Sequence, residues 1–173
     1  LPGLRRAVPH RSHGGAPDPR PPADAISLKL GINVQGGSSL SPRTFAPAII
    51  GMVKIIREKH PLIPLAVISP IISPPRETTP NAVGLSLSRM RVEVADAVKR
   101  LQDCGDGHVH YVDGLRLFDA AWVADCLPDQ LHPNAEGYQR LGQRFVDVVV
   151  DPIFLACHAT ARGPNGRFVR SAP

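Results

Sequence analysis

Apolar residues along the chain follow two alternating patterns. Short apolar runs that end in turn-forming or polar residues are typical of strands, and there are three: "AISLKLGIN" from Ala25, "LAVISPII" from Leu65 and "HVHYVDG" from His108. Longer segments with apolar residues at helical spacing lie between and after them: "FAPAIIGMVKIIREKH" from Phe45, "LSLSRMRVEVADAVKRLQDCG" from Leu85 and "AEGYQRLGQRFVDVVVDPIF" from Ala135. Strict alternation of strand and helix predicts an α/β fold with a parallel sheet and helices on its faces.

The two ends of the chain lack this pattern. Residues 1–22 contain six prolines and almost no large apolar side chains after Val8, so they are predicted to form a disordered, Pro- and Arg-rich leader. Residues 158–173 are predicted to be a basic disordered tail. One domain is therefore expected from residue 23 to residue 157.

The net charge of +5 belongs to the ends, which hold seven arginines and one aspartate. The body retains 13 basic and 14 acidic residues and is close to neutral. No aromatic residues interleave with the terminal arginines, so solvated tails are favoured over nucleic-acid-binding arms, and no nucleic acid is expected as a partner.

Cysteine spacing and hydropathy exclude several classes of protein. Cys104, Cys126 and Cys157 are odd in number and show no CxxC or Cys/His zinc spacing, so free thiols are expected and no metal or cofactor is predicted. No run reaches the roughly 18 apolar residues of a membrane span, and the N-terminus lacks the apolar core of a signal peptide. The chain as given is expected to be cytoplasmic.

In open parallel sheets, ligands bind beyond the carboxyl ends of the strands. Three features fall there: "GIN" at 31–33, "SPPRE" at 73–77, and the segment from Asp113 to His132. Gly31 and Asn33 could also form only an ordinary turn, because Gly and Asn are favoured where the chain leaves a strand.

The stretch "LPDQLHPNAEGY" holds the strongest candidate chemistry. Asp129 precedes His132 by three residues, and a carboxylate that accepts from one imidazole nitrogen leaves the other nitrogen available to take a proton from a nucleophile. The alternative is a structural His–Pro loop in which Asn134 caps the following helix. His108 and His110 alternate in a predicted strand; a surface pair is favoured over a metal site because no third ligand has a suitable spacing.

The "GIN" strand end, the two further strand–helix units and "DQLHPNAEGY" resemble the SGNH hydrolases, also called GDSL esterases and lipases. The resemblance runs from about Asp24 to Val150. It implies a three-layer α/β/α fold with a parallel sheet, the flavodoxin-like fold of that family. It also implies that His132 is the general base, Asp129 orients it, and Asn33 donates to the oxyanion of an ester substrate.

The departures from the family pattern are equally specific. No GDS-like serine motif occurs in the 173 residues, the block with the second oxyanion donor is absent, and Val34 replaces the usual Asp. The domain is therefore expected to be N-terminally truncated, equivalent to the C-terminal two-thirds of the fold. Ser38, Ser39 and Ser73 are poor candidates for a substitute nucleophile, because none lies at a strand-to-helix elbow.

Two function classes follow from this pattern. One is a carboxylic ester hydrolase whose nucleophile block is missing from this chain, and the other is a catalytically inactive binding or scaffold domain. Without the family's central first strand, the strand near Ala25–Leu30 would have an unpaired edge, and self-association through that edge is expected.

Overall fold

The computed structural model describes residues 23–156. Its elements run in the order β1 (Ile26–Lys29), α1 (Ile32–Gly37), α2 (Pro42–Arg57), β2 (Leu65–Ile68), η1 (Pro74–Arg76), α3 (Leu87–Asp103), β3 (Val109–Val112), η2 (Gly114–Arg116), η3 (Ala120–Trp122), α4 (Val123–Cys126), α5 (Ala135–Phe145) and η4 (Val146–Leu155). The predicted leader at 1–22, the tail at 158–173 and Cys157 lie outside the described residues. Within them, Cys104 and Cys126 are free thiols.

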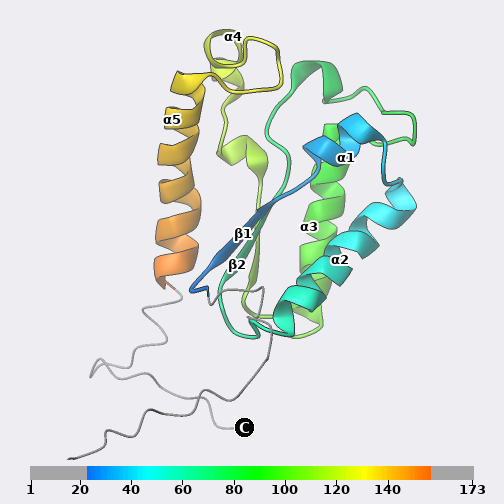
Figure 1. Ribbon diagram of the computed structural model, residues 1–173, viewed down its shortest axis with the longest axis vertical. Coiled ribbons are helices and arrows are strands. Elements are labelled where there is room, and N and C mark those ends of the chain that lie inside the picture. Colours follow the sequence, from blue (N-terminus) through cyan, green and yellow to red (C-terminus); the bar gives the residue numbers. More distant parts are fainter. Residues whose placement is uncertain (1–22, 157–173) are drawn as a thin grey trace, which may run out of the picture.

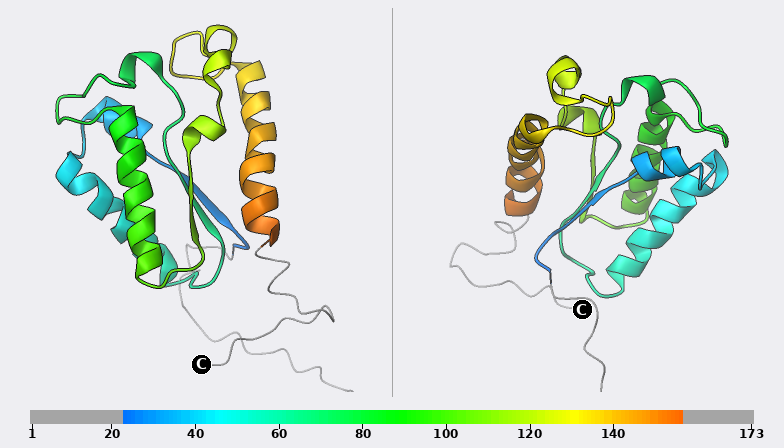
Figure 2. Two further views of the ribbon diagram at one scale, coloured as in Figure 1. Left: turned by 180° about the vertical axis from the view of Figure 1, so that it is seen from behind. Right: turned by 45° about the horizontal axis from the view of Figure 1, so that its top comes forward.

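The sheet has three parallel strands in the order β1-β2-β3. Helices α2 and α3 cover one face, and α5 with η4 covers the other, so the molecule has three layers (Figure 1, Figure 2). The predicted α/β/α architecture with a parallel sheet is confirmed.

The side chains of β2 contribute to the hydrophobic cores on both faces of the sheet, because successive side chains of a strand point to opposite faces. Leu65 and Val67 join the core under α2 and α3, whereas Ala66 and Ile68 join the core under α5 and η4. All four are buried, as expected of a central parallel strand covered on both faces.

Two strand ends and one helix differ from the sequence expectation. β2 ends at Ile68 rather than continuing through "SPII", because Pro70 has no amide to donate to the ladder. The segment after Gly31 is the short helix α1 rather than a simple turn. The last helix changes at Val146 to π-helical turns that contain Pro152, which cannot keep the α-helical hydrogen-bond pattern.

The carboxyl ends of all three strands meet at the end of the molecule that carries α1, η1 and α4 (Figure 1). No helix within residues 23–156 combines the length and apolar character that crossing a bilayer requires.

Candidate active site

His132 and Asp129 form a close pair at this end of the sheet. Nδ1 of His132 lies 2.6 Å from Oδ2 of Asp129. A carboxylate only accepts hydrogen bonds, so the geometry assigns the proton to Nδ1 and leaves Nε2 as the basic nitrogen. The side chains of His132 and Asp129 are 70% and 52% exposed, so both are accessible to solvent.

The second oxygen of Asp129 is held by the backbone of its own loop. Oδ1 accepts from the amide of His132 at 2.6 Å and from the amide of Leu131 at 3.0 Å. The backbone hydrogen bond from His132, followed by its side-chain hydrogen bond, lowers the pKa of Asp129 well below its ordinary value. The carboxylate therefore stays ionised and oriented beside the imidazole.

The loop that carries this pair is fixed by the start of α5. Asn134 caps the helix: its Oδ1 accepts from the amide of Gly137 at 2.9 Å, and its Nδ2 donates to the carbonyl of Asp125 at 2.8 Å. A Cβ at Gly137 would lie 2.9 Å from the carbonyl oxygen of Cys126, so glycine is needed for this close approach. The structural and the catalytic interpretations of the "HPNAEGY" stretch are thus compatible, since the cap places His132.

Asn33 reaches the same end of the sheet through a tight turn after β1. Gly31 has φ +115°, a conformation that side-chain-bearing residues rarely adopt, and a Cβ there would meet Pro70 Cγ at 2.5 Å. α1 begins immediately after this glycine and presents Asn33, which is exposed.

Asn33 and His132 line one cavity of about 320 Å³. Its walls come from the carboxyl ends of β1 and β2 and from the loop before α5; besides this pair, they include Lys29, Ile32, Gly36, Gly37, Ile71, Ile72, Ser73, Arg76, Leu131, Pro133 and Tyr138. The sequence candidates Asn33, His132 and Asp129 are therefore brought together, with Asp129 behind the imidazole. Their catalytic roles stay predictions.

Ser73 lines the cavity, but its hydroxyl is already hydrogen-bonded to other residues of the protein. Its hydroxyl is buried, donates to the carbonyl of Gln130 at 2.7 Å and accepts from Nη1 of Arg76 at 3.1 Å. Gln130 adjoins Asp129 and has φ +59°, and this bond connects the loop after β2 to the loop that carries Asp129 and His132. Ser73 is a support for the Asp129 loop rather than a nucleophile in this arrangement.

The loop after β2 is itself anchored by a partly buried ion pair between Arg91 and Glu77. Two guanidinium nitrogens of Arg91 contact the carboxylate at 2.7 and 2.8 Å, and its Nε donates to the carbonyl of Pro70 at 3.0 Å. Glu77 also accepts from the amide of Ser73. Burial alone would raise the pKa of Glu77, but the hydrogen bonds from Arg91 and Ser73 outweigh it and lower that pKa.

The model of the GDSL-like lipase/acylhydrolase family matches residues 2–140. The chain belongs to this family. The match covers β1 to the first half of α5, and it also begins before residue 23, where the sequence analysis placed the start of the domain.

Solved structures of GDSL-like and related enzymes share this fold. Salicylyl-acyltransferase SsfX3 from a tetracycline biosynthetic pathway is 30% identical with a TM-score of 0.66 over 75% of this chain and 38% of its own. A protein from Bacteroides ovatus ATCC 8483 described as a GDSL-like lipase is 21% identical, with a TM-score of 0.60 over 78% of this chain and 36% of its own. A peptidoglycan O-acetylesterase is 18% identical, with a TM-score of 0.56 over 78% of this chain and 39% of its own.

This chain of the GDSL-like family thus spans less than half the length of these three relatives. No curated protein sequence matches it.

Other sequence candidates fall outside the site. Among residues 23–156, no group of three or more His, Cys, Asp or Glu side chains could hold a metal ion, and His108 lies before β3, at the opposite end of that strand from the site. Ser38 and Ser39 do not line the cavity. Sequence reasoning missed Lys29 and Arg76 as cavity residues. The period-two alternation of β1 indicates the face of Lys29, but no local pattern shows that it lines the same cavity as Arg76.

Proposed function

We propose that this chain supplies the base, the orienting acid and an oxyanion donor for hydrolysis of a carboxylic ester by a Ser–His–Asp mechanism. The observation that carries the proposal is the 2.6 Å Nδ1–Oδ2 contact between His132 and Asp129 on the wall of a cavity that also holds Asn33. The substrate is a small-molecule ester.

The proposed steps follow from the tautomer. A serine hydroxyl attacks the ester carbonyl while Nε2 of His132 takes its proton, and the same nitrogen then returns that proton to the leaving alcohol. A water molecule next loses a proton to Nε2 and attacks the acyl-serine ester, which regenerates the hydroxyl and releases the acid. Asp129 stabilises the imidazolium in both halves, and the Asn33 amide donates to the oxyanion.

The nucleophile is proposed to lie on a GDS-like block outside these 173 residues, which contain no such motif. Ser73 is excluded from the role because its proton is held by the carbonyl of Gln130. Loss of a nucleophile removes on the order of 10⁶-fold of hydrolase activity, so this chain by itself is expected to be inactive.

A second candidate function rests on that same absence. A binding or scaffold domain could have the same fold and cavity, and it would need no nucleophile. The two functions differ in one measurable respect, since only the first predicts ester turnover once a GDS-like block is joined upstream.

The test is hydrolysis of short-chain p-nitrophenyl esters by this chain and by a version extended upstream in its coding region. Activity in the extended version that is lost in His132→Ala and kept in His108→Ala would support the hydrolase. His108 is the matched control because it lies at the amino end of β3. An extended version with a GDS-like block and no turnover would favour the binding domain.

A further inference from the structure

Two cationic side chains share the cavity wall with Asn33 and His132. Lys29 is the last residue of β1, and Arg76 is the last residue of η1. No carboxylate is among the residues that line this cavity. The residues that line the cavity therefore carry positive charge without a compensating carboxylate among them.

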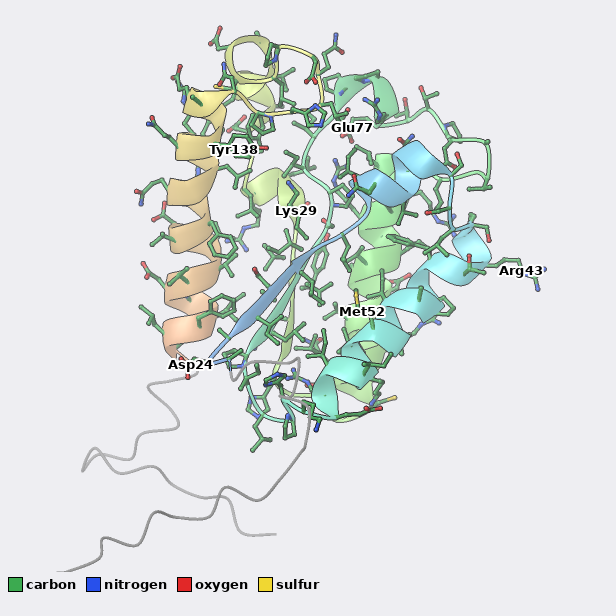
Figure 3. All side chains as sticks on the ribbon, viewed as in Figure 1. Asp24, Lys29, Arg43, Met52, Glu77 and Tyr138 are labelled. Carbon is green, nitrogen blue, oxygen red and sulfur yellow. The ribbon has the colours of Figure 1, made fainter. Side chains whose placement is uncertain are left out.

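The direction of Lys29 follows from the pleat of β1. Ile26 and Leu28 pack against the core beneath α2 and α3, so Lys29 projects to the opposite face, toward α5. Figure 3 shows it at the carboxyl end of β1, between α1 and the helix that carries Tyr138.

The nearby carboxylates are already matched by other groups. Glu77 is paired with Arg91, and Asp129 with His132 and two backbone amides. Among residues 23–156, no acidic side chain forms an ion pair with Lys29 or Arg76. Two charges at the cavity thus lack a counter-ion within the described part of the chain.

Both cations have hydrogen-bonding capacity that a ligand would satisfy. Of the guanidinium nitrogens of Arg76, Nη1 donates to Ser73, and Nε and Nη2 have no partner among the described residues. That remaining edge has the planar two-donor geometry that a carboxylate accepts. Burial lowers the pKa of Lys29 by desolvating its ammonium group, a cost that an adjacent anion would offset.

The rest of the cavity suits an aliphatic chain. Ile32, Ile71, Ile72 and Leu131 provide apolar wall between the polar groups. An ester that fits all of these features has its carbonyl near Asn33 and His132, a short hydrocarbon segment, and a negative charge at the far end.

We propose that the cavity selects carboxylic esters that carry a free carboxylate, which Lys29 and Arg76 recognise. The inference rests on the proposed function, because it assumes that the ester lies against His132 and Asn33. It adds the substrate class, namely half-esters of short dicarboxylic acids rather than neutral esters.

Ligand binding tests the charge preference without requiring turnover. The probe is monomethyl glutarate, and its neutral match is dimethyl glutarate, each titrated into the ¹⁵N-labelled 173-residue chain while the Asn33 amide and the His132 imidazole are followed by NMR. We expect the half-ester to bind at least 10-fold more tightly than the diester, with a preference that weakens as salt is added.

Substitutions assign the preference to the two residues. Lys29→Met and Arg76→Met should each remove most of it, and Arg76→Lys should restore part of it by keeping the charge. Lys54→Met and Arg43→Met are controls on the exposed surface of α2, where Arg43 points away from the site (Figure 3). Thermal melts of each variant establish that it is folded.

The outcomes separate this inference from the proposed function. Equal binding of both esters at Asn33 and His132 overturns the charge selection and leaves the ester site intact. A preference that persists in both methionine variants also overturns it. If neither ester perturbs Asn33 or His132, the assignment of the ester site fails together with the inference.

Discussion

Oδ1 of Asp129 accepts from the backbone amide of His132, while Oδ2 of the same carboxylate lies 2.6 Å from Nδ1 of the His132 ring. One carboxylate thus holds both the backbone and the side chain of the proposed base. This double attachment makes the protonation of Asp129 a sensitive measure of the site.

The pKa of Asp129 should be measurably depressed. Its carboxyl is held ionised first by the His132 amide and then by the His132 side chain. We expect its carboxyl ¹³C resonance to titrate below the ordinary Asp pKa of about 3.9. His132→Ala keeps the amide but loses the ring, so it should move the midpoint partly back; an unchanged midpoint would contradict a role for the ring contact.

The same depression predicts the pH dependence of stability. A carboxyl whose folded pKa lies below its unfolded value contributes stability above the unfolded pKa, near 3.9 for Asp, and loses it as pH falls through the folded pKa. We therefore expect urea midpoints of the parent chain and of Asp129→Asn to differ above about pH 4. They should converge at lower pH, and a difference that grows with acidity would have the wrong sign.

In a version that contains the nucleophile, the site residues should differ in their effects on turnover. Asp129→Asn would fix the wrong tautomer and should lower kcat on the order of 10⁴-fold, and Asn33→Ala should lower it roughly 10²–10³-fold by removing one oxyanion donor. The 173-residue chain should show no ester turnover above background. Turnover by that chain that is abolished by both His132→Ala and Ser38→Ala would show that a substitute serine operates.

Ser73→Ala should destabilise the fold by roughly 1–3 kcal/mol, because it leaves the carbonyl of Gln130 and an N–H of Arg76 without their buried partner. Ser39→Ala is the control, since Ser39 is exposed and does not line the cavity. Urea unfolding measures both. If the two substitutions have equal effects, the Ser73–Gln130 bond does not support the Asp129 loop.

Gly114→Ala should destabilise the chain by about 2 kcal/mol or more, because its Cβ would lie 2.3 Å from the carbonyl oxygen of Ser69 and 2.4 Å from that of Pro70. The control is Gly51→Ala in α2, where a Cβ meets nothing within 4 Å. That change should stabilise by about 0.5–1 kcal/mol through helix propensity. Thermal denaturation should therefore move in opposite directions for the two variants.

Self-association should proceed through β1. Within the described residues β1 pairs only with β2, so its other edge is open for pairing with a second chain. We expect the weight-average mass in sedimentation to rise with concentration. Ser27→Lys places a charge on this edge and should reduce the rise more than Ser39→Lys does; a concentration-independent monomer would exclude the edge as an interface.

The order of strands and helices and the local chemistry of the Asp129–His132 loop can be predicted from the sequence alone. Strand and helix periodicity reflects which side chains must be buried, and this is read from neighbours two to four residues apart. The pairing of Asp129 with His132 is equally local, because they are three positions apart and both their side-chain and backbone groups lie in one turn.

The surroundings of that pair, by contrast, depend on how distant segments of the chain pack together. Ser73 contacts Gln130, which is 57 residues away, and Lys29 of β1 and Arg76 of η1 line the same cavity. The close approach of Gly31 to Pro70 likewise depends on how the loops cross above the sheet. These relationships depend on strand order and packing between distant segments, which leave no periodic or short-range signal in the sequence.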